Sequence, residues 1–232
     1  ALASFEGANR DFGTHAWGED ALAALGSAHG HAYLAYPALA LGMARLVDPS
    51  FPPPVAAVHD RVIAALARRL EASKTGLIDT YPGEAFPTDV AAVAAAIAVH
   101  GRATGTDHRL TLEGWVKRVR SLQRHSSGLV WQRMDSLTGH PLDAPRGSGT
   151  GLSAYFAGFV DRALARELTD ALLEHERTLL GFGAIAEYAA GSAHGGEVLG
   201  EIVETEFDLE RAMALVDRRL RDFHHRRGIV HA

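Results

Sequence analysis

Cysteine is absent from this chain of 232 residues. Its absence excludes disulfide bonds, zinc sites built on thiolates and a cysteine nucleophile. It leaves the redox compartment open, because a protein without thiols is compatible with oxidising and reducing surroundings alike.

Lysine is scarce, and the chain has no excess of positive charge. Lys74 and Lys117 are its only lysines, and the formal net charge is -5 with an isoelectric point near 6.2. No run of Lys or Arg is interleaved with aromatic residues, so the composition argues against nucleic acid as a partner.

Long apolar runs are also missing. None approaches the roughly 20 residues that are needed to span a bilayer. Residues 1–10 lack the basic and then apolar order of a signal peptide. The sequence therefore predicts a soluble chain without a membrane span, and it leaves the compartment open between the cytoplasm and the periplasm.

Helical periodicity is the main feature of the hydrophobic pattern. The chain is 47% hydrophobic and its pattern continues without a linker, which predicts a single domain over residues 1–232. Apolar residues recur at spacings of three and four, and alternating segments are almost absent, so the predicted class is all-α. A C-terminal helix at about 200–227, acidic at its start and basic at its end, diverges from the rest. We expect helices at about 19–46, 55–73, 87–103, 108–125, 149–159, 162–180 and 204–226.

A short motif of one Gly and two aliphatic residues recurs at steps of 52 and 55 residues, the length of a helical hairpin with its loops. Residues 90–99 are almost entirely Ala, Val and Ile, as in a helix buried on every side, whereas residues 55–70 carry one polar face. Alternation of inner and outer helices predicts an (α/α) toroid, and a ring of six hairpins needs about 310 residues, so a partial toroid is expected. The motifs are Gly76-Leu77-Ile78, Gly128-Leu129-Val130 and Gly183-Ala184-Ile185.

The loop after the first motif is the densest candidate for chemistry. Two prolines and a glycine between residues 81 and 89 should fix the backbone, so that polar side chains arrive with little freedom. Glu84 and Asp89 form a candidate acid and base pair, with Tyr81 beside them. If Glu84 is the general acid, Glu84→Gln should cost at least about 100-fold in turnover. The alternative is that Asp89 caps a helix and that Glu84 pairs with an arginine.

The loops after the second and third motifs supply candidate substrate-binding groups. Glycines 147, 149 and 151 open a helix whose amide groups favour an anion, and Arg146 would add a bidentate grip. A structural turn with an Arg–Asp pair is the alternative. Because equivalent loops of stacked hairpins converge on one rim, we predict that Glu84, Asp89, Arg146 and Glu187 line one cavity. The substrate-binding candidates are Tyr36, Arg146, Tyr155, Glu187 and Tyr188.

Histidines near the amino end invite a metal interpretation. His29 and His31 lie close in sequence to Glu19 and Asp20. No HExxH or other tight ligand spacing is present, and thirteen histidines in the chain produce such neighbours by chance. The prediction is therefore no metal and no cofactor.

Several stretches together resemble the linalool dehydratase/isomerase-like proteins and their uncharacterised bacterial relatives. They are residues 33–41, an aromatic-rich inner helix, residues 81–90, a Pro-containing loop that enters an Ala-rich helix, and the blocks 141–148 and 179–183. The resemblance implies an (α/α) barrel with a central apolar pocket, and acid–base addition and removal of water on a terpene alcohol. This chain has Gly83 where the enzyme places a His and Asp89 where it places a Cys. Glu84 with Asp89 would then serve as acid and base, and Tyr36 and Tyr81 as pocket aromatics.

Three functions follow as hypotheses. The first is a cofactor-independent lyase or isomerase, dehydratase-like, that acts on a small organic substrate in the toroid mouth, with a terpenoid as one candidate. The second is a carbohydrate-active hydrolase, with Trp17 and Trp131 as stacking platforms. The third is a binding or assembly module in which a homo-oligomer covers the open end of the partial ring.

Overall fold

The computed structural model describes residues 2–179, 182–189 and 198–199, and helices dominate them, as the sequence predicts. The α-helices are α1 (Leu2–Trp17), α2 (Ala35–Val47), α3 (Pro53–Ala72), α4 (Pro87–Thr104), α5 (Arg109–Arg118), α6 (Gly147–Ala157) and α7 (Arg162–Leu173). Shorter helical turns are η1 (Ala23–Gly26), η2 (Ala32–Leu34) and the π-helical η3 (Val119–Gln123). The predicted C-terminal helix lies outside the described residues.

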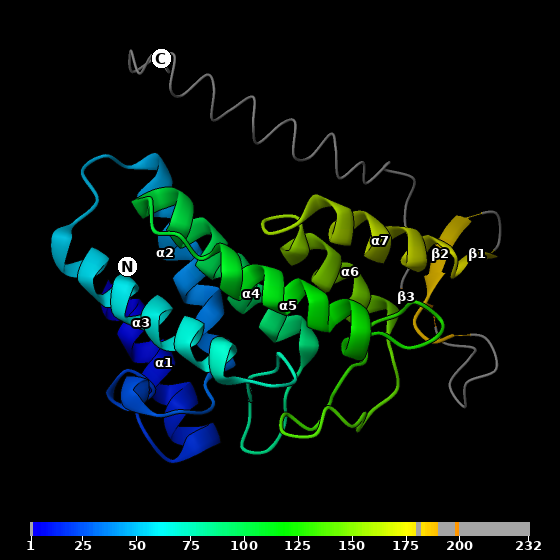
Figure 1. Ribbon diagram of the computed structural model, residues 1–232, viewed down its shortest axis with the longest axis horizontal. Helices are drawn as coiled ribbons and strands as arrows, with labels where there is room; N and C mark the ends of the chain where they lie inside the picture. Colours follow the sequence, from blue (N-terminus) through cyan, green and yellow to red (C-terminus); the bar gives the residue numbers. More distant parts are fainter. Residues whose placement is uncertain (1, 180–181, 190–197, 200–232) are drawn as a thin grey trace, which may run out of the picture.

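Helix α4 lies at the centre of the molecule. Every residue from Val90 to His100 is buried, which confirms the prediction of a helix that is buried on every side. It packs against α2 on one side and α6 on the other, while α3 and α5 also contact it and α7 covers α6. Figure 1 shows the hairpins following one another, from α1 to α3 at one end to α6 and α7 at the other. None of the described helices is long and apolar enough to cross a membrane.

The small side chains of α2 and α4 explain their close packing. A Cβ added at Gly42 on α2 would lie 2.9 Å from Cγ1 of Val99 on α4. Buried interiors have few voids, so the missing side chain is what allows this approach.

The repeated glycine motif has a structural cause. Gly76 and Gly128 both adopt positive φ, 70° and 84°, and they lie against α5 and α7, respectively. An added Cβ would meet Cδ of Arg118 at 2.6 Å in the first case and Cβ of Ala171 at 2.7 Å in the second. Each loop is thereby fixed to the following hairpin, and the aliphatic pair after each glycine is buried.

The predicted helix at 19–46 is wrong in its first half, because the helix begins only at Ala35. Gly18, Gly30 and His31 take positive φ, 71°, 82° and 61°, which a continuous right-handed helix does not allow. The buried guanidinium of Arg69 donates to the carbonyls of Ala24, Ser27 and Gly30. A long-range partner thus replaces the hydrogen bonds that a helix would make. Helix α1, before this turn, is not among the predicted elements.

A small antiparallel sheet follows α7, in the order β1-β2-β3, and is the exception to the all-α prediction. The predicted helix at 162–180 ends at Leu173. Pairing with β2 overrides the helical pattern of the following residues, since local propensity is a weak preference that tertiary partners outweigh. The strands are β1 (Glu176–Leu179), β2 (Phe182–Ala186) and β3 (Val198–Leu199).

Candidate functional site

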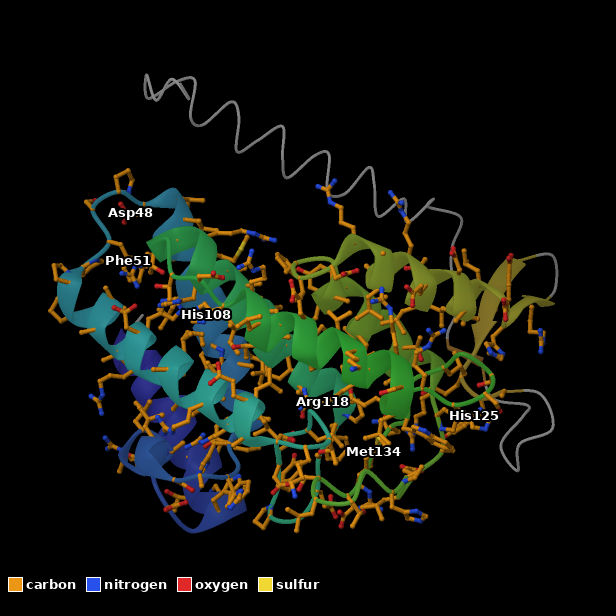
Figure 2. All side chains as sticks on the ribbon, in the orientation of Figure 1. Asp48, Phe51, His108, Arg118, His125 and Met134 are labelled. Atoms are coloured by element: carbon orange, nitrogen blue, oxygen red, sulfur yellow. The ribbon has the colours of Figure 1, made fainter. Side chains whose placement is uncertain are left out.

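The loops that follow α3, η3 and α7 contact one another. Ala85 of the first loop and Met134 of the second exchange backbone hydrogen bonds of 3.1 and 2.9 Å. The amide of Gly147, at the start of α6, donates to the carbonyl of Glu187 at 2.7 Å. Figure 2 labels Met134 among these loops and Phe51 at the far end of α2. Neighbouring loops therefore form a continuous rim.

A tight turn over residues 81–84 shapes the first loop. The amide of Glu84 donates to the carbonyl of Tyr81 at 2.9 Å, and the amide of Tyr81 donates back at 3.2 Å. Pro82 and Gly83, the latter at φ 77°, occupy the two central positions, as a type II turn requires. The turn holds Tyr81 at the rim, where it is 42% exposed.

Asp89 lies in the first turn of α4 and accepts two short hydrogen bonds. The hydroxyl of Tyr36 donates to Oδ1 at 2.6 Å, and that of Thr80 donates to Oδ2 at 2.6 Å. Phe86 is the residue before the helix, and no side chain caps it. The alternative that Asp89 is merely a helix cap is therefore wrong. The carboxylate bridges α2 and the first loop instead.

Asp89 borders a cavity of about 450 Å³. Neighbouring rings line one wall, with centroids 4.1 Å apart for Phe12 and Tyr33, 5.7 Å for Phe12 and Tyr81, and 6.0 Å for Tyr81 and Phe86. The lining residues are Phe12, Tyr33, Tyr36, Thr80, Tyr81, Phe86 and Asp89.

The electrostatics of this cavity centre on the Tyr36–Asp89 contact. Burial raises the pKa of the Tyr36 hydroxyl, and the hydrogen bond to Asp89 and the charge of that carboxylate raise it further. Tyr36 therefore keeps its proton and remains a donor. The partial positive charge at the amino end of α4 also favours an anion at this position.

Trp17, the last residue of α1, and His31, from the segment that links α1 to α2, pack behind lining residues of the cavity. The indole of Trp17 donates to the carbonyl of Thr80 at 3.0 Å and packs on His31 with ring centroids 4.6 Å apart. His31 is fully buried, lies 3.2 Å from a carboxylate oxygen of Glu19, and has a pKa lowered by burial, against the opposing hydrogen bond to Glu19. The histidine that invited a metal interpretation thus packs behind the cavity and is not among its lining residues. No group of three or more metal-ligating side chains occurs among the described residues.

Glu84 has a different environment from Asp89. Its carboxylate accepts a hydrogen bond of 2.7 Å from Nη1 of Arg133, and both side chains are about one-third exposed, at 38% and 34%. The structure therefore places Glu84 in the arginine pair that was its alternative interpretation. The cavity that Asp89 borders does not include Glu84 in its lining.

The predicted anion site at the start of α6 is filled by the protein itself. Glu187 accepts from the amide of Ser148 at 2.9 Å and from its hydroxyl at 2.6 Å. Arg146 pairs with Asp143 at 3.2 Å and lies over the ring of Tyr188, 5.4 Å from its centroid. Arg146, Glu187 and Tyr188 thus lie together at the junction of the second and third loops, apart from the lining of the Asp89 cavity.

Tyr155 belongs to neither group. It is 46% exposed on α6 and packs on Phe156 and Phe159, with centroids 5.2 and 5.5 Å apart. Phe156 in turn contacts the ring of Tyr36 at 5.9 Å. Tyr155 therefore reaches the cavity only through Phe156.

Larger volume alone does not identify the site. A cavity of about 930 Å³ lies between α4, α5 and the turn after α6. Several of its charged groups are already paired, since Arg120 pairs with Asp161 and Glu167 and Arg109 pairs with Asp107, and its lining also includes Lys117 and Glu113. The Asp89 cavity instead combines one carboxylate with neutral partners, and we take it as the candidate site.

A third cavity, of about 330 Å³, contains Asp79. Burial raises the pKa of this carboxyl, against a hydrogen bond from Ser136 and the charge of His29. Arg69 and Lys74 line the same cavity. This cavity therefore contains cationic side chains, unlike the described lining of the Asp89 cavity, and the charge of Asp135 adds to the effect of burial on Asp79.

Four residues of the candidate site, Phe12, Tyr33, Thr80 and Phe86, are not among the predicted ones. Thr80 directly precedes the turn at residues 81–84, and this position is the one sequence feature that could have identified it as a site residue. Phe12 comes from α1, which has no predicted counterpart, and no motif marks it. No protein-family model matches the chain, and no curated protein matches its sequence. The assignment of function therefore rests on this geometry.

Proposed function

We propose that the chain is a cofactor-independent acid–base enzyme, a lyase or isomerase that acts on a small organic substrate in the Asp89 cavity. The observation that carries the proposal is a carboxylate held by two neutral hydroxyls at the edge of an aromatic cavity. Such a carboxylate is oriented by its partners and is not neutralised by a cation, as a general base requires.

Asp89 would remove a proton from the carbon next to the departing group. The two hydroxyl donors fix both carboxylate oxygens, so the base is oriented before the substrate arrives. A departing hydroxyl needs a proton of its own in order to leave as water. Tyr81, which lines the same cavity, is our candidate for that donor.

The resemblance to linalool dehydratase/isomerase-like proteins supports the same reaction class, with Asp89 at the position of the enzyme's Cys. The packing of α2, α3, α5 and α6 against α4 supports the proposal that the hairpins form part of an (α/α) toroid. The carbohydrate alternative has less support, because Trp17 and Trp131 are not among the lining residues of this cavity. Trp17 donates to Thr80, and Trp131 packs on His125 at 4.8 Å.

Exchange of substrate hydrogen for deuterium tests the proposal whatever the product is. Small tertiary, allylic and amino alcohols are incubated with the protein in D₂O, and deuterium incorporation is followed by mass spectrometry. The unaltered chain should catalyse exchange or loss of water, and Asp89→Asn should reduce the rate by at least about 100-fold.

Asp107→Asn is the matched control for this substitution. The Asp107 side chain is 73% exposed and accepts from the amide of Arg109, a contact that Asn can keep. Activity should be unchanged. The absence of both exchange and loss of water with every alcohol of the panel, or equal rates for the chain and Asp89→Asn, would remove the proposal.

A further inference from the structure

The rings of the Asp89 cavity adjoin one another. Phe12 contacts both Tyr33 and Tyr81, and Tyr81 contacts Phe86, with all three centroid distances between 4.1 and 6.0 Å. The faces of aromatic rings carry partial negative charge and attract cations within about 6 Å of their centroids. Several rings beside one cavity are the arrangement by which proteins bind quaternary ammonium groups.

The charge of the lining is negative. Asp89 is its one carboxylate, and no Lys, Arg or His occurs among the described residues that line this cavity. The partners of Asp89 are the neutral hydroxyls of Tyr36 and Thr80. Behind the wall, burial raises the pKa of Tyr33, and the charges of Asp20 and Glu19 add to this against the opposing charge of Arg69. A positive group is the natural complement of this surface.

The cavity is open to small molecules from solvent. Tyr36 and Tyr81 are 43% and 42% exposed, and the volume of about 450 Å³ falls within the range of ligand pockets. A quaternary ammonium donates no hydrogen bond and therefore needs the rings and a counter-charge, whereas a hydroxyl on the same molecule can accept a hydrogen bond from Tyr81.

We propose that the substrate is a small amino alcohol with a quaternary or protonated tertiary ammonium group. The ammonium lies against the rings of Phe12 and Phe86 with Asp89 as its counter-charge, and the hydroxyl lies at the hydroxyl of Tyr81, its proton donor. This inference rests on the proposed function, because it names the substrate class of the same site.

Choline and its neutral carbon isostere, 3,3-dimethylbutan-1-ol, test the proposal. They share shape and hydroxyl and differ in charge, and their affinities for the full chain are measured by calorimetry or ligand-observed NMR. Choline should bind at least about tenfold more tightly. Asp89→Asn should weaken choline at least about tenfold, and Phe86→Leu should weaken it about threefold or more, while both variants keep the affinity for the isostere.

Phe51→Leu is the control for loss of a ring. Phe51 follows the carboxyl end of α2, whereas Tyr36 lies in its first turn, so this variant should bind choline normally. Retained isostere binding shows that each variant is folded. Equal affinity for choline and the isostere overturns the ammonium inference, and exchange on neutral alcohols alone would leave the proposed function standing. Conversely, charge-selective choline binding without exchange on any alcohol overturns the enzyme and keeps the cation site.

Discussion

Two aspartates near opposite ends of α4 show how similar groups reach different states. Asp89 is on the first turn of α4, and His100, the partner of Asp60, is eleven residues further along, about 16 Å at 1.5 Å per residue. Asp60 pairs with Arg45 and with Nε2 of His100, the latter at 3.1 Å. Asp89 has two hydroxyl partners and, among the described residues, no ion pair.

The difference lies in the charge of the partners. Burial raises the pKa of Asp60, but hydrogen bonds from Arg45 and His100 outweigh it and hold that pKa below its ordinary value. The negative charge of Asp60 is therefore compensated within the fold by Arg45 and His100. The charge of Asp89 has no cationic partner among the described residues and remains available to a ligand. We therefore assign a structural role to Asp60 and a functional role to Asp89.

The largest expected effect on stability is at the Asp60 end. Burial lowers the pKa of His59 to about 4, and the charges of His100 and Arg45 act in the same direction. Because the unfolded chain binds this proton near pH 6.5, stability is present above that pH and is lost as the pH falls towards 4. His59 should account for a loss of about 2–3 kcal/mol between pH 7 and pH 4.5.

Chemical denaturation at the two pH values measures this loss. His59→Leu should be less pH-dependent than the unaltered chain, since the contributions of other groups cancel in the comparison. An equal loss in both proteins would show that His59 does not stay neutral in the folded state.

Removal of the charge of Asp60 is the next largest effect. Asp60→Asn leaves Arg45 without its carboxylate, and the site is half exposed, so we expect a loss of about 1 kcal/mol in the free energy of unfolding. Deuterium exchange should stay within about threefold of the unaltered rate, because the site is far from the base. A loss of exchange as large as that of Asp89→Asn would contradict the assignment of a structural role to Asp60 and a catalytic role to Asp89.

The smallest effect is expected at Glu84. Its pair with Arg133 is exposed enough that Glu84→Gln should cost at most about 1 kcal/mol of stability. The exchange rate should fall less than in Asp89→Asn, since Glu84 has a cationic partner and lies outside the cavity lining. A 100-fold loss in Glu84→Gln would instead identify Glu84 as the general acid, which is the role that the loop sequence favours.

Local patterns predicted much of the helical fold. The Ala-rich run at 90–99 is enclosed on every side, and the Pro-Gly pair at 82–83 forms the turn that its composition favours. The turn at 18–34 could not be predicted in this way, because its conformation depends on Arg69, about forty residues away. The strands after α7 likewise depend on pairing with a later segment.

The candidate site could be predicted only in part, because some of its contacts also join segments that are distant in the sequence. Tyr36, Tyr81 and Asp89 were marked by the loop and by the aromatic helix, and they do share a cavity. The pairings of Glu84 with Arg133 and of Glu187 with Ser148 join different loops. A list of polar residues on one rim does not determine which of them neutralise each other.

A crystal structure of the chain with bound choline tests the central claim most directly, because it shows the partners of Asp89 and the position of the cation together. We predict the ammonium within about 6 Å of at least two ring centroids, with Asp89 bonded to Tyr36 and Thr80 and to no arginine, lysine or histidine. An Asp89 paired with a cationic side chain of the protein, as Asp60 is, or choline bound elsewhere, would contradict the account.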